Sequence, residues 1–285
     1  MARTIRVNAK RRPRLGQNFL SDPHAAQRIV DALGDLSGST VVEIGPGRGA
    51  LTDLLARRAR RLIAIEVDRL LAAQLGLRYA RQPNVEIVEA DILSVDLSSL
   101  IAIEPGAVIP RRVGGRAVVV GNLPYYITSP ILMRLFTFAG SIERIVVLVQ
   151  REVAERVIAR PGTRDYGVLS ATAQLYARVE KLFTLPPGAF SPPPKVHSTL
   201  LRLTISPRDA ELGIVAEEFV EFLKLCFGQK RKTLRNNLKF RYEEPAVLRA
   251  LAEADVRGDV RAEALSLEKT AALFHSLRHR TPAIE

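Results

Sequence analysis

The sequence predicts an α/β fold in which helices cover both faces of a parallel sheet, with a small all-helical region after it. Up to residue 205, short apolar strands alternate with helical segments, which is typical of strands joined by crossover helices. After Pro207, the apolar residues keep helical spacing and no strand pattern remains. We therefore expect two domains, 1–207 and 208–285, of which the first starts with a basic segment at 1–20.

The first domain is expected to open with a helix over 21–33, because Ser21 or Asp22 can cap it and Pro23 suits its first turn. The segment 101–116 is rich in Pro and Gly and reads as a long surface loop. The remaining expected elements are strands at 41–44, 61–68, 85–90, 117–120, 144–150 and 196–205, and helices at 50–59, from the second strand to Tyr79, at 129–138 and from Glu152 onward.

The composition is that of an ordinary globular protein, with 47% hydrophobic and 25% charged residues among 285. No run of 18 or more apolar residues is present, so we expect no membrane span. The basic N-terminus has no apolar segment behind it, unlike a secretory signal. The single Cys226 excludes an internal disulfide framework and suits the cytoplasm. We expect a cytoplasmic monomer without a metal site and without a catalytic histidine.

Basic residues outnumber acidic residues and gather in clusters. The formal net charge is +12, and the clusters are KRRPR at 10–14, RRARR at 57–61 and QKRKTLRNNLKFR at 229–241. Such clusters concentrate positive potential and attract polyanions. The sequence therefore indicates nucleic-acid binding, with the N-terminal segment and the 229–241 cluster as the expected surface.

A glycine-rich turn follows the first strand of the expected sheet. Gly45, Gly47 and Gly49 allow the backbone to approach a ligand closely, because no Cβ interferes. The turn is not a P-loop, since no Gly-Lys-Ser/Thr follows. It does fit the dinucleotide pattern G-x-G-x-x-G/A, so more than one nucleoside ligand stays open.

Acidic residues end the next two expected strands. Glu66 lies about 20 residues beyond the first glycine, where a carboxylate can accept hydrogen bonds from two ribose hydroxyls of either NAD or S-adenosylmethionine. Asp91 ends the third strand and can accept from an adenine amino group. Because parallel strands end at one edge of an open sheet, these positions together predict an adenosine pocket.

The stretch GNLPYYITSP at 121–130 follows the fourth expected strand. The amide oxygen of Asn122 and the carbonyls around Leu123 and Pro124 are acceptors beside the pocket. Two acceptors can hold both hydrogens of an exocyclic base amine and turn the nitrogen lone pair toward an electrophile. Tyr125 offers a flat face for base stacking, which contributes about 1–3 kcal/mol per base. An oxidoreductase has no use for these groups, whereas a base-amine methyltransferase does.

A second aromatic residue, Phe190, lies in AFSPPPKVHS. Three consecutive prolines at 192–194 make a stiff, polyproline-like stretch that can hold Phe190 against the other face of the base. Lys195, which follows the prolines, can reach a phosphate.

Several motifs follow one another over nearly all of residues 10–240. They are QNFL (17–20), VVEIGPGRGALT, IAIEVD, EADIL, GNLPYYITSPIL, LVQREVAERV, YGVLS, AFSPPPKVHS and GQKRKTLRNNL. Together they resemble the small-subunit ribosomal RNA adenine dimethyltransferases. The resemblance implies a Rossmann-like, seven-stranded class I methyltransferase domain that uses S-adenosylmethionine, and a helical C-terminal domain that binds RNA.

The resemblance also implies a reaction and a site. The reaction is dimethylation at N6 of two adjacent adenines near the 3′ end of small-subunit rRNA, a step in ribosome biogenesis, with that rRNA or the subunit precursor as partner. By the family pattern, the cofactor site would consist of Asn18, Leu20, Gly45, Gly47, Glu66, Asp91, Ile92 and Asn122. The target adenine would be held by Asn122, Leu123, Pro124, Tyr125 and Phe190.

Relatives that methylate large-subunit rRNA and confer antibiotic resistance share QNFL and an Asn-x-Pro-Tyr/Phe motif. YGVLS, PPPKVHS and KRKTLRNNL favour the small-subunit branch. The 101–116 loop is longer than the family pattern needs, and its role stays open.

Two alternatives stay open at this point. One is an NAD-dependent oxidoreductase with the same glycine turn, and the other is an RNA-binding assembly or transcription factor that keeps the fold without the chemistry. The intact 122–125 segment argues against the second. The expected mechanism is in-line displacement, in which adenine N6 attacks the sulfonium methyl group while Asn122 and a nearby carbonyl position the amine.

Overall fold

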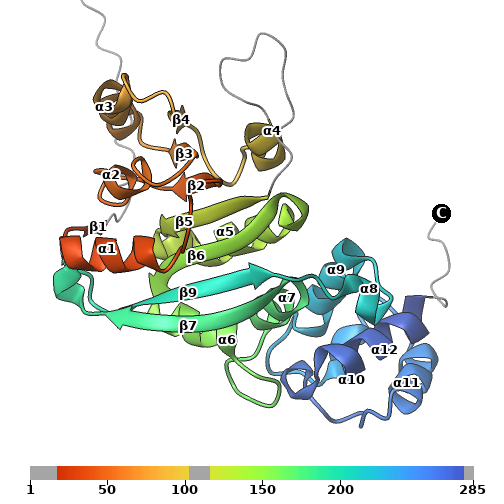
Figure 1. Cartoon of the computed structure of the whole chain (residues 1–285). Helices are drawn as coiled ribbons and strands as arrows, with labels where there is room; N and C mark the ends of the chain where they lie inside the picture. Colours follow the sequence, from red (N-terminus) through yellow and green to blue (C-terminus); the bar gives the residue numbers. More distant parts are fainter. Residues whose placement is uncertain (1–17, 103–115, 279–285) are drawn as a thin grey trace, which may run out of the picture.

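A seven-stranded sheet forms the centre of the protein (Figure 1). The computed structural model describes residues 18–102 and 116–278. Five neighbouring strands run parallel, and the last two are antiparallel to their neighbours, so the α/β prediction is confirmed with a mixed sheet. In spatial order the strands are β4 Val85–Glu89, β3 Arg61–Glu66, β2 Thr40–Ile44, β5 Ala117–Asn122, β6 Ile142–Gln150, β9 Ser198–Ile205 and β7 Ala177–Leu185.

Helices cover both faces of this sheet, as predicted. Side chains alternate along a strand, so in β5 Val118 and Val120 belong to one apolar cluster while Ala117 and Val119 belong to the other. The first cluster packs against α1 Pro23–Asp31, α2 Thr52–Leu55 and α3 Arg69–Tyr79. The second packs against α4 Leu97–Ala102, α5 Thr128–Phe136, α6 Arg151–Ile158 and α7 Val168–Tyr176.

The strand order reverses between β2 and β5, which is the place where ligands bind in open α/β sheets. The chain proceeds outward from β2 through β3 to β4 and then returns to β5 on the other side of β2. These two strands approach closely at Gly121, where an added Cβ would lie 2.6 Å from the carbonyl oxygen of Ile44. Glycine at this position therefore lets Asn122 lie beside the turn that follows Ile44.

The sequence pattern predicts neither α7 nor β7. Strand β7 pairs with β9 alone and forms an edge of the sheet. Several of its polar side chains, such as Glu180 and Lys181, are exposed, so the continuous apolar run of a buried strand is missing.

The helix predicted at 50–59 is regular only over the four residues of α2. Residues 47–51, which precede α2, have turn conformation, and the positive φ angles of Gly47 and Gly49 prevent the helix from starting earlier. Most of the predicted 101–116 loop lies outside the described residues, and its first two positions belong to α4.

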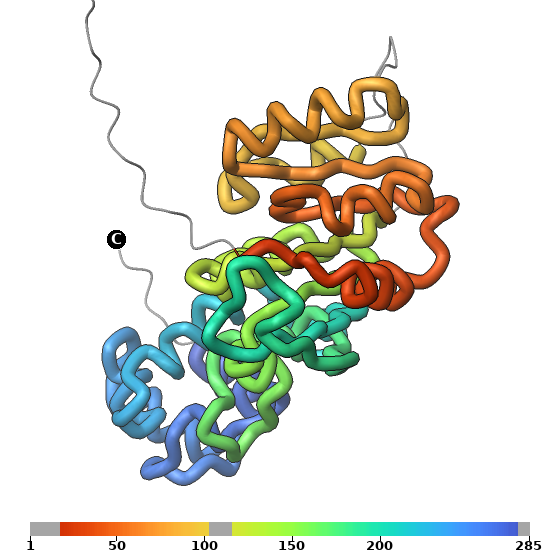
Figure 2. The backbone as a smooth tube through the Cα atoms, turned by 90° about the vertical axis from the view of Figure 1, so that its left-hand side faces the viewer, coloured from red at the N-terminus to blue at the C-terminus, as the bar shows by residue number. Residues whose placement is uncertain are grey.

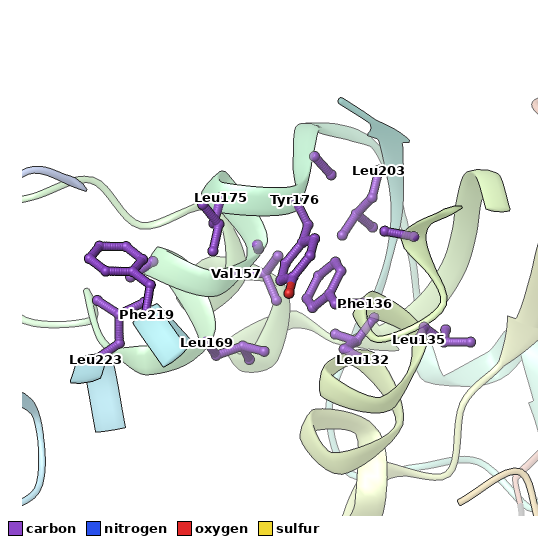
Figure 3. Packing of buried hydrophobic residues seen from close by; sticks show 14 of the residues in the cluster. Leu132, Leu135, Phe136, Val157, Leu169, Leu175, Tyr176, Leu203, Phe219 and Leu223 are labelled. Carbon is purple, nitrogen blue, oxygen red and sulfur yellow. The ribbon is translucent and has the colours of Figure 1, made fainter. Parts of the chain in front are cut away.

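Only helical elements follow Ile205 within the described part of the chain. They are α8 Asp209–Leu212, α9 Ala216–Cys226, α10 Leu234–Leu238, α11 Glu244–Glu253, a 3₁₀ turn at Ala262–Ala264, and α12 Leu267–Arg278. Figure 3 shows Phe219 and Leu223 of α9 next to α7, which carries Leu169 and Leu175, and one apolar cluster contains all four. A shared core thus joins the chain on either side of residue 207. None of the helices in the described ranges is long and apolar enough to cross a membrane.

The first described residues run along the sheet edge where the parallel strands end. Strand β1 Phe19–Leu20 pairs antiparallel with β8 Phe190–Ser191 (Figure 2, red and teal). The backbone N–H of Ser21 also donates to the carbonyl of Ala189 at 2.9 Å. This pairing holds the QNFL motif against the segment that precedes the three prolines.

Candidate active site

A cavity lies at the sheet edge where β2, β3, β4 and β5 end. It contains about 1010 Å³ of empty space, including its open mouth, which suits a small-molecule site. Every residue predicted for the cofactor lines it, and so does the whole predicted 122–125 segment, whereas Phe190 does not. The lining residues are 18–20, 43–48, 50–51, 65–67, 90–92, 122–127 and Ile131.

The glycine turn forms one wall of the cavity. Gly45 donates its N–H to the carbonyl of Ile65 at 2.9 Å, which ties the start of the turn to β3. An added Cβ on Gly47 would lie 2.9 Å from the ring of Phe19, so the QNFL segment packs directly on the turn. Gly49 does not line the cavity, and an added Cβ there would lie 3.2 Å from side chains of α3. Gly49 therefore serves the packing of the turn rather than the ligand wall.

Glu66 ends β3 with its carboxylate held in one orientation. The residue is 2% exposed, and its two oxygens accept backbone N–H groups from Gly47 at 3.0 Å and Asp68 at 2.9 Å. Burial raises the pKa of Glu66 above its ordinary value, and the two N–H donors oppose this shift. Each carboxylate oxygen has a second lone pair, so acceptor capacity is left for a ligand in the cavity.

Asp91 and Ile92 follow β4 and complete this side of the cavity. The exposed carboxylate of Asp91 accepts the backbone N–H of Leu93 at 2.9 Å, and Ile92 is buried. The backbone N–H of Ala90 donates to the carbonyl of Glu66 at 3.0 Å, which continues the pairing of β3 with β4 up to the site.

Asn122 lines the cavity and carries an unused acceptor. Its Nδ2 donates to the backbone carbonyl of Asn18 at 2.8 Å. Since only the nitrogen of the amide can donate to a carbonyl, this bond sets the amide orientation. The opposite atom, Oδ1, is buried and has no hydrogen-bond partner among the described residues.

The segment after Asn122 offers a second free acceptor. The N–H of Leu123 donates to the carbonyl of Leu148 at 3.0 Å, while the carbonyl of Leu123 accepts no hydrogen bond from a described residue. The carbonyl of Pro124 already accepts the N–H of Ile127 at 3.2 Å and the hydroxyl of Thr128 at 3.0 Å. Of the carbonyls of Leu123 and Pro124, that of Leu123 is therefore the one available to accept a hydrogen bond from a ligand.

The two predicted aromatic residues differ in placement. Tyr125 lines the cavity, is partly buried and shares a hydrogen bond between its hydroxyl and Ser198 Oγ at 2.6 Å. Phe190 is 3% exposed in the apolar cluster that also contains Leu20 and Ala189, so its ring is covered in this structure. A stacking role for Phe190 stays a prediction.

Glu43 is a cavity residue that was not expected from the motifs in the sequence. It lies in β2, is 1% exposed, and its Oε2 has no hydrogen-bond partner among the described residues. Burial raises the pKa of Glu43 to about 8, and the nearby carboxylates of Glu66 and Asp53 act in the same direction. The signal in the sequence is a charged residue inside the otherwise apolar strand VVEI.

We expect the substitution Glu43→Gln to remove a pH dependence of stability. Below pH 4.5, the ordinary pKa, the carboxyl is protonated in both the folded and the unfolded chain. Between this pH and about 8 only the unfolded chain releases the proton. The free energy of unfolding of the wild type should therefore fall as pH rises, by at most about 1.4 kcal/mol per pH unit.

Glutamine cannot ionise, so the variant should lack this slope and be the more stable protein at pH 8. Urea unfolding of both proteins from pH 5 to pH 8 measures the difference. Parallel stability curves for the two proteins would contradict the expectation.

Some residues of the basic clusters pair with acidic side chains within the fold, and others are exposed and form no ion pair among the described residues. Arg61 is buried, with Nη2 2.8 Å from Glu86 Oε2, and Arg58 pairs with Asp31 at 2.7 Å, so much of the 57–61 cluster is engaged within the fold. The cluster at 10–14 lies outside the described residues. In the 229–241 cluster, four exposed residues form no ion pair within the described residues. They are Lys230, Arg231, Lys232 and Arg241.

Comparison with known sequences matches the chain to one family over nearly its full length. The family model described as ribosomal RNA adenine dimethylase matches residues 8–279. The ribosomal RNA small subunit methyltransferase A of Koribacter versatilis is 58% identical over 270 residues, covering 94% of this chain and 95% of that protein. The protein of the same name from Acidobacterium capsulatum is 56% identical over 276 residues, covering 96% and 94%.

Two solved structures are similar to this chain in fold. A dimethyladenosine transferase from Plasmodium falciparum is similar in fold, with a TM-score of 0.74, 24% identity, and coverage of 92% of this chain and 98% of that one. The 23S rRNA methyltransferase ErmE has a TM-score of 0.63 and 29% identity, with coverage of 92% and 100%. Since the family model spans most of the chain and the first two relatives are more than half identical, the chain belongs to the ribosomal RNA adenine dimethylase family.

Proposed function

We propose that this protein transfers methyl groups from S-adenosylmethionine to N6 of two adjacent adenines near the 3′ end of small-subunit rRNA, which makes N6,N6-dimethyladenosine during ribosome biogenesis. The family membership supports the reaction class. The observation that carries the proposal is the buried, unpartnered Oδ1 of Asn122 in the cavity wall. A free acceptor at this position suits a ligand that brings an N–H donor.

The cavity lining fits S-adenosylmethionine, which supplies an electrophilic methyl group on a positively charged sulfur. Two carboxylates, those of Glu66 and Asp91, line the cavity together with the carboxyl of Glu43, whose raised pKa keeps it protonated at neutral pH, against one basic side chain, that of Arg48. An acidic lining favours a cationic ligand and disfavours the two phosphates of NAD. The lining and the family membership together leave the oxidoreductase alternative without support.

Each cofactor residue has a role that follows from its contacts. Glu66, oriented by the N–H groups of Gly47 and Asp68, would accept from the ribose hydroxyls. Asp91 would accept from the adenine amino group, and the buried side chains of Leu20 and Ile92 would form apolar walls. The remaining contacts would come from the backbone of Asn18, Gly45 and Gly47.

The target amine would be held by two acceptors. Asn122 Oδ1 and the carbonyl of Leu123 are both free to accept its two hydrogens. With both hydrogens held, the nitrogen lone pair is directed away from the base ring and toward the methyl group. Tyr125, anchored through Ser198, would stack on the base. Positioning of this kind lowers the barrier without a strong base.

The direct test is a methyl-transfer assay. Small subunits from cells that lack this gene are incubated with the protein and S-adenosylmethionine, and digested rRNA is analysed by mass spectrometry. We expect N6,N6-dimethyladenosine at two adjacent positions of the small-subunit rRNA. Subunits that stay unmethylated would contradict the proposed function. RNA binding without methylation would favour the assembly-factor alternative.

We also propose that 208–285 acts as an RNA-binding domain and that the protein works as a cytoplasmic monomer. Reversing one free charge, Arg231→Glu, is expected to remove about one phosphate contact. The dependence of log affinity on log salt should become shallower by about 0.7–0.9. Filter binding to small subunits at several salt concentrations measures this slope.

A matched control is Arg81→Glu, which reverses one exposed charge in the loop between α3 and β4. This loop precedes β4, so it lies at the opposite end of the strands from the cavity. This control should leave the salt dependence unchanged. Equal slopes for Arg231→Glu and the wild type would mean that the RNA surface lies elsewhere.

A further inference from the structure

The side chain of Tyr126 has no use in the site described so far. It lines the cavity and is 60% exposed, although its neighbour Tyr125 is partly buried. Its ring stacks on no aromatic ring and its hydroxyl forms no hydrogen bond among the described residues. A large aromatic side chain therefore stands free at the cavity that would receive the base.

The backbone that carries Tyr126 is held firmly. Tyr125–Ile127 form a 3₁₀ turn between β5 and α5, directly after Pro124. The carbonyl of Pro124 accepts hydrogen bonds from the N–H of Ile127 and the hydroxyl of Thr128. The hydroxyl of Tyr125 is anchored on Ser198, which is fully buried at the start of β9. Adjacent tyrosines are thus divided between a fixed inner ring and a free outer ring on one short turn.

A target adenine can reach Asn122 only when it leaves the RNA stack, because a base held between its neighbours cannot enter the cavity. The nucleotide next to it then loses one stacking partner. An exposed aromatic ring can replace that partner, and such stacking needs no hydrogen bond to a particular base. A ring at the cavity mouth is close to both the extruded base and its neighbour in the strand.

We propose that Tyr126 is a stacking platform for the unpaired base that adjoins the target adenine. This inference rests on the proposed function. It assigns the two tyrosines separate ligands, the target base for Tyr125 and the neighbouring base for Tyr126.

The test measures methyl transfer to unmethylated small subunits by Tyr126→Ala, Tyr126→Phe and the wild type. Loss of the ring should raise KM for the subunit about tenfold, which corresponds to about 1.4 kcal/mol. The dissociation constant of S-adenosylmethionine should not change. Tyr126→Phe keeps the ring and should behave like the wild type. Leu77→Ala, which truncates an 83% exposed side chain of α3 that does not line the cavity, should have no effect.

A second substrate separates stacking from other effects. This substrate is a subunit reconstituted with an abasic nucleotide in place of one of the two adenines. The KM of the wild type for it should be about tenfold higher than for the intact subunit. For Tyr126→Ala, the abasic site should raise KM little further. If the substitution and the abasic site each raised KM independently of the other, the stacking platform would be overturned. A KM of Tyr126→Ala for intact subunits within twofold of the wild type would overturn it as well. Weaker S-adenosylmethionine binding by this variant would assign the ring to the cofactor and also overturn it. A wild type that transfers no methyl group at all would overturn the proposed function and this site with it.

Discussion

Replacing Asn122 with alanine is expected to lower the rate of methyl transfer by about 10²–10³-fold, the scale of losing one positioned hydrogen-bond partner of a reacting group. The variant loses the acceptor Oδ1 and the bond from Nδ2 to the carbonyl of Asn18. Binding of S-adenosylmethionine should stay measurable, because the contacts proposed for Glu66 and Asp91 are untouched. Single-turnover methyl transfer with unmethylated subunits gives the rate, and calorimetry gives the dissociation constant.

Asn122→Asp is the informative companion variant. It keeps oxygen acceptors in the cavity but cannot donate to Asn18, so its orientation is no longer set. Its rate should lie between those of the wild type and Asn122→Ala. A rate for Asn122→Ala within tenfold of the wild type would remove the amide from the proposed mechanism.

Replacing Glu66 with alanine is expected to weaken S-adenosylmethionine binding at least tenfold, or about 1.4 kcal/mol. Hydrogen bonds to a charged group contribute about 1.5–3 kcal/mol. The substitution also leaves the N–H groups of Gly47 and Asp68 without their acceptor. Glu66→Gln retains one side-chain oxygen, so its dissociation constant for S-adenosylmethionine should lie between those of the wild type and Glu66→Ala. Calorimetric titration measures all three dissociation constants.

The neighbouring strand supplies a matched control for this substitution. Glu89 ends β4 and is paired in register with Glu66, but it is exposed and does not line the cavity. Glu89→Ala should therefore bind S-adenosylmethionine as the wild type does. An unchanged dissociation constant in Glu66→Ala would argue that the ribose lies elsewhere in the cavity.

Much of the site could be predicted because parallel strands end together. The glycine turn, Glu66, Asp91 and Asn122 each follow or end an apolar strand in the sequence. A parallel sheet brings such positions to one edge whatever the details of packing. The structure places all of them around one cavity.

Three other features depend on the folded chain, each for its own physical reason. Strand β7 has one partner and an exposed side, so its polar residues hide the strand pattern and only pairing with β9 decides its conformation. Glu43 occupies an apolar strand, where a charge looks like an interruption until the cavity beside it is known. Phe190 is apolar enough to suit either a base or a core, and in this structure its ring packs in the core.

The order of apolar strands, glycines and strand-end polar residues determined the α/β fold, the ligand edge and the motifs from which the family could be inferred. These features depend on local periodicity and on the common direction of the strands. The tertiary structure alone decided which atoms are free to act. The carbonyl that orients Asn122 comes from a residue 104 positions earlier, and the choice of the Leu123 carbonyl follows from hydrogen bonds that engage Pro124. Whether a polar atom is available depends on which partners the folded chain brings within about 3 Å of it, and spacing along the sequence does not contain that information.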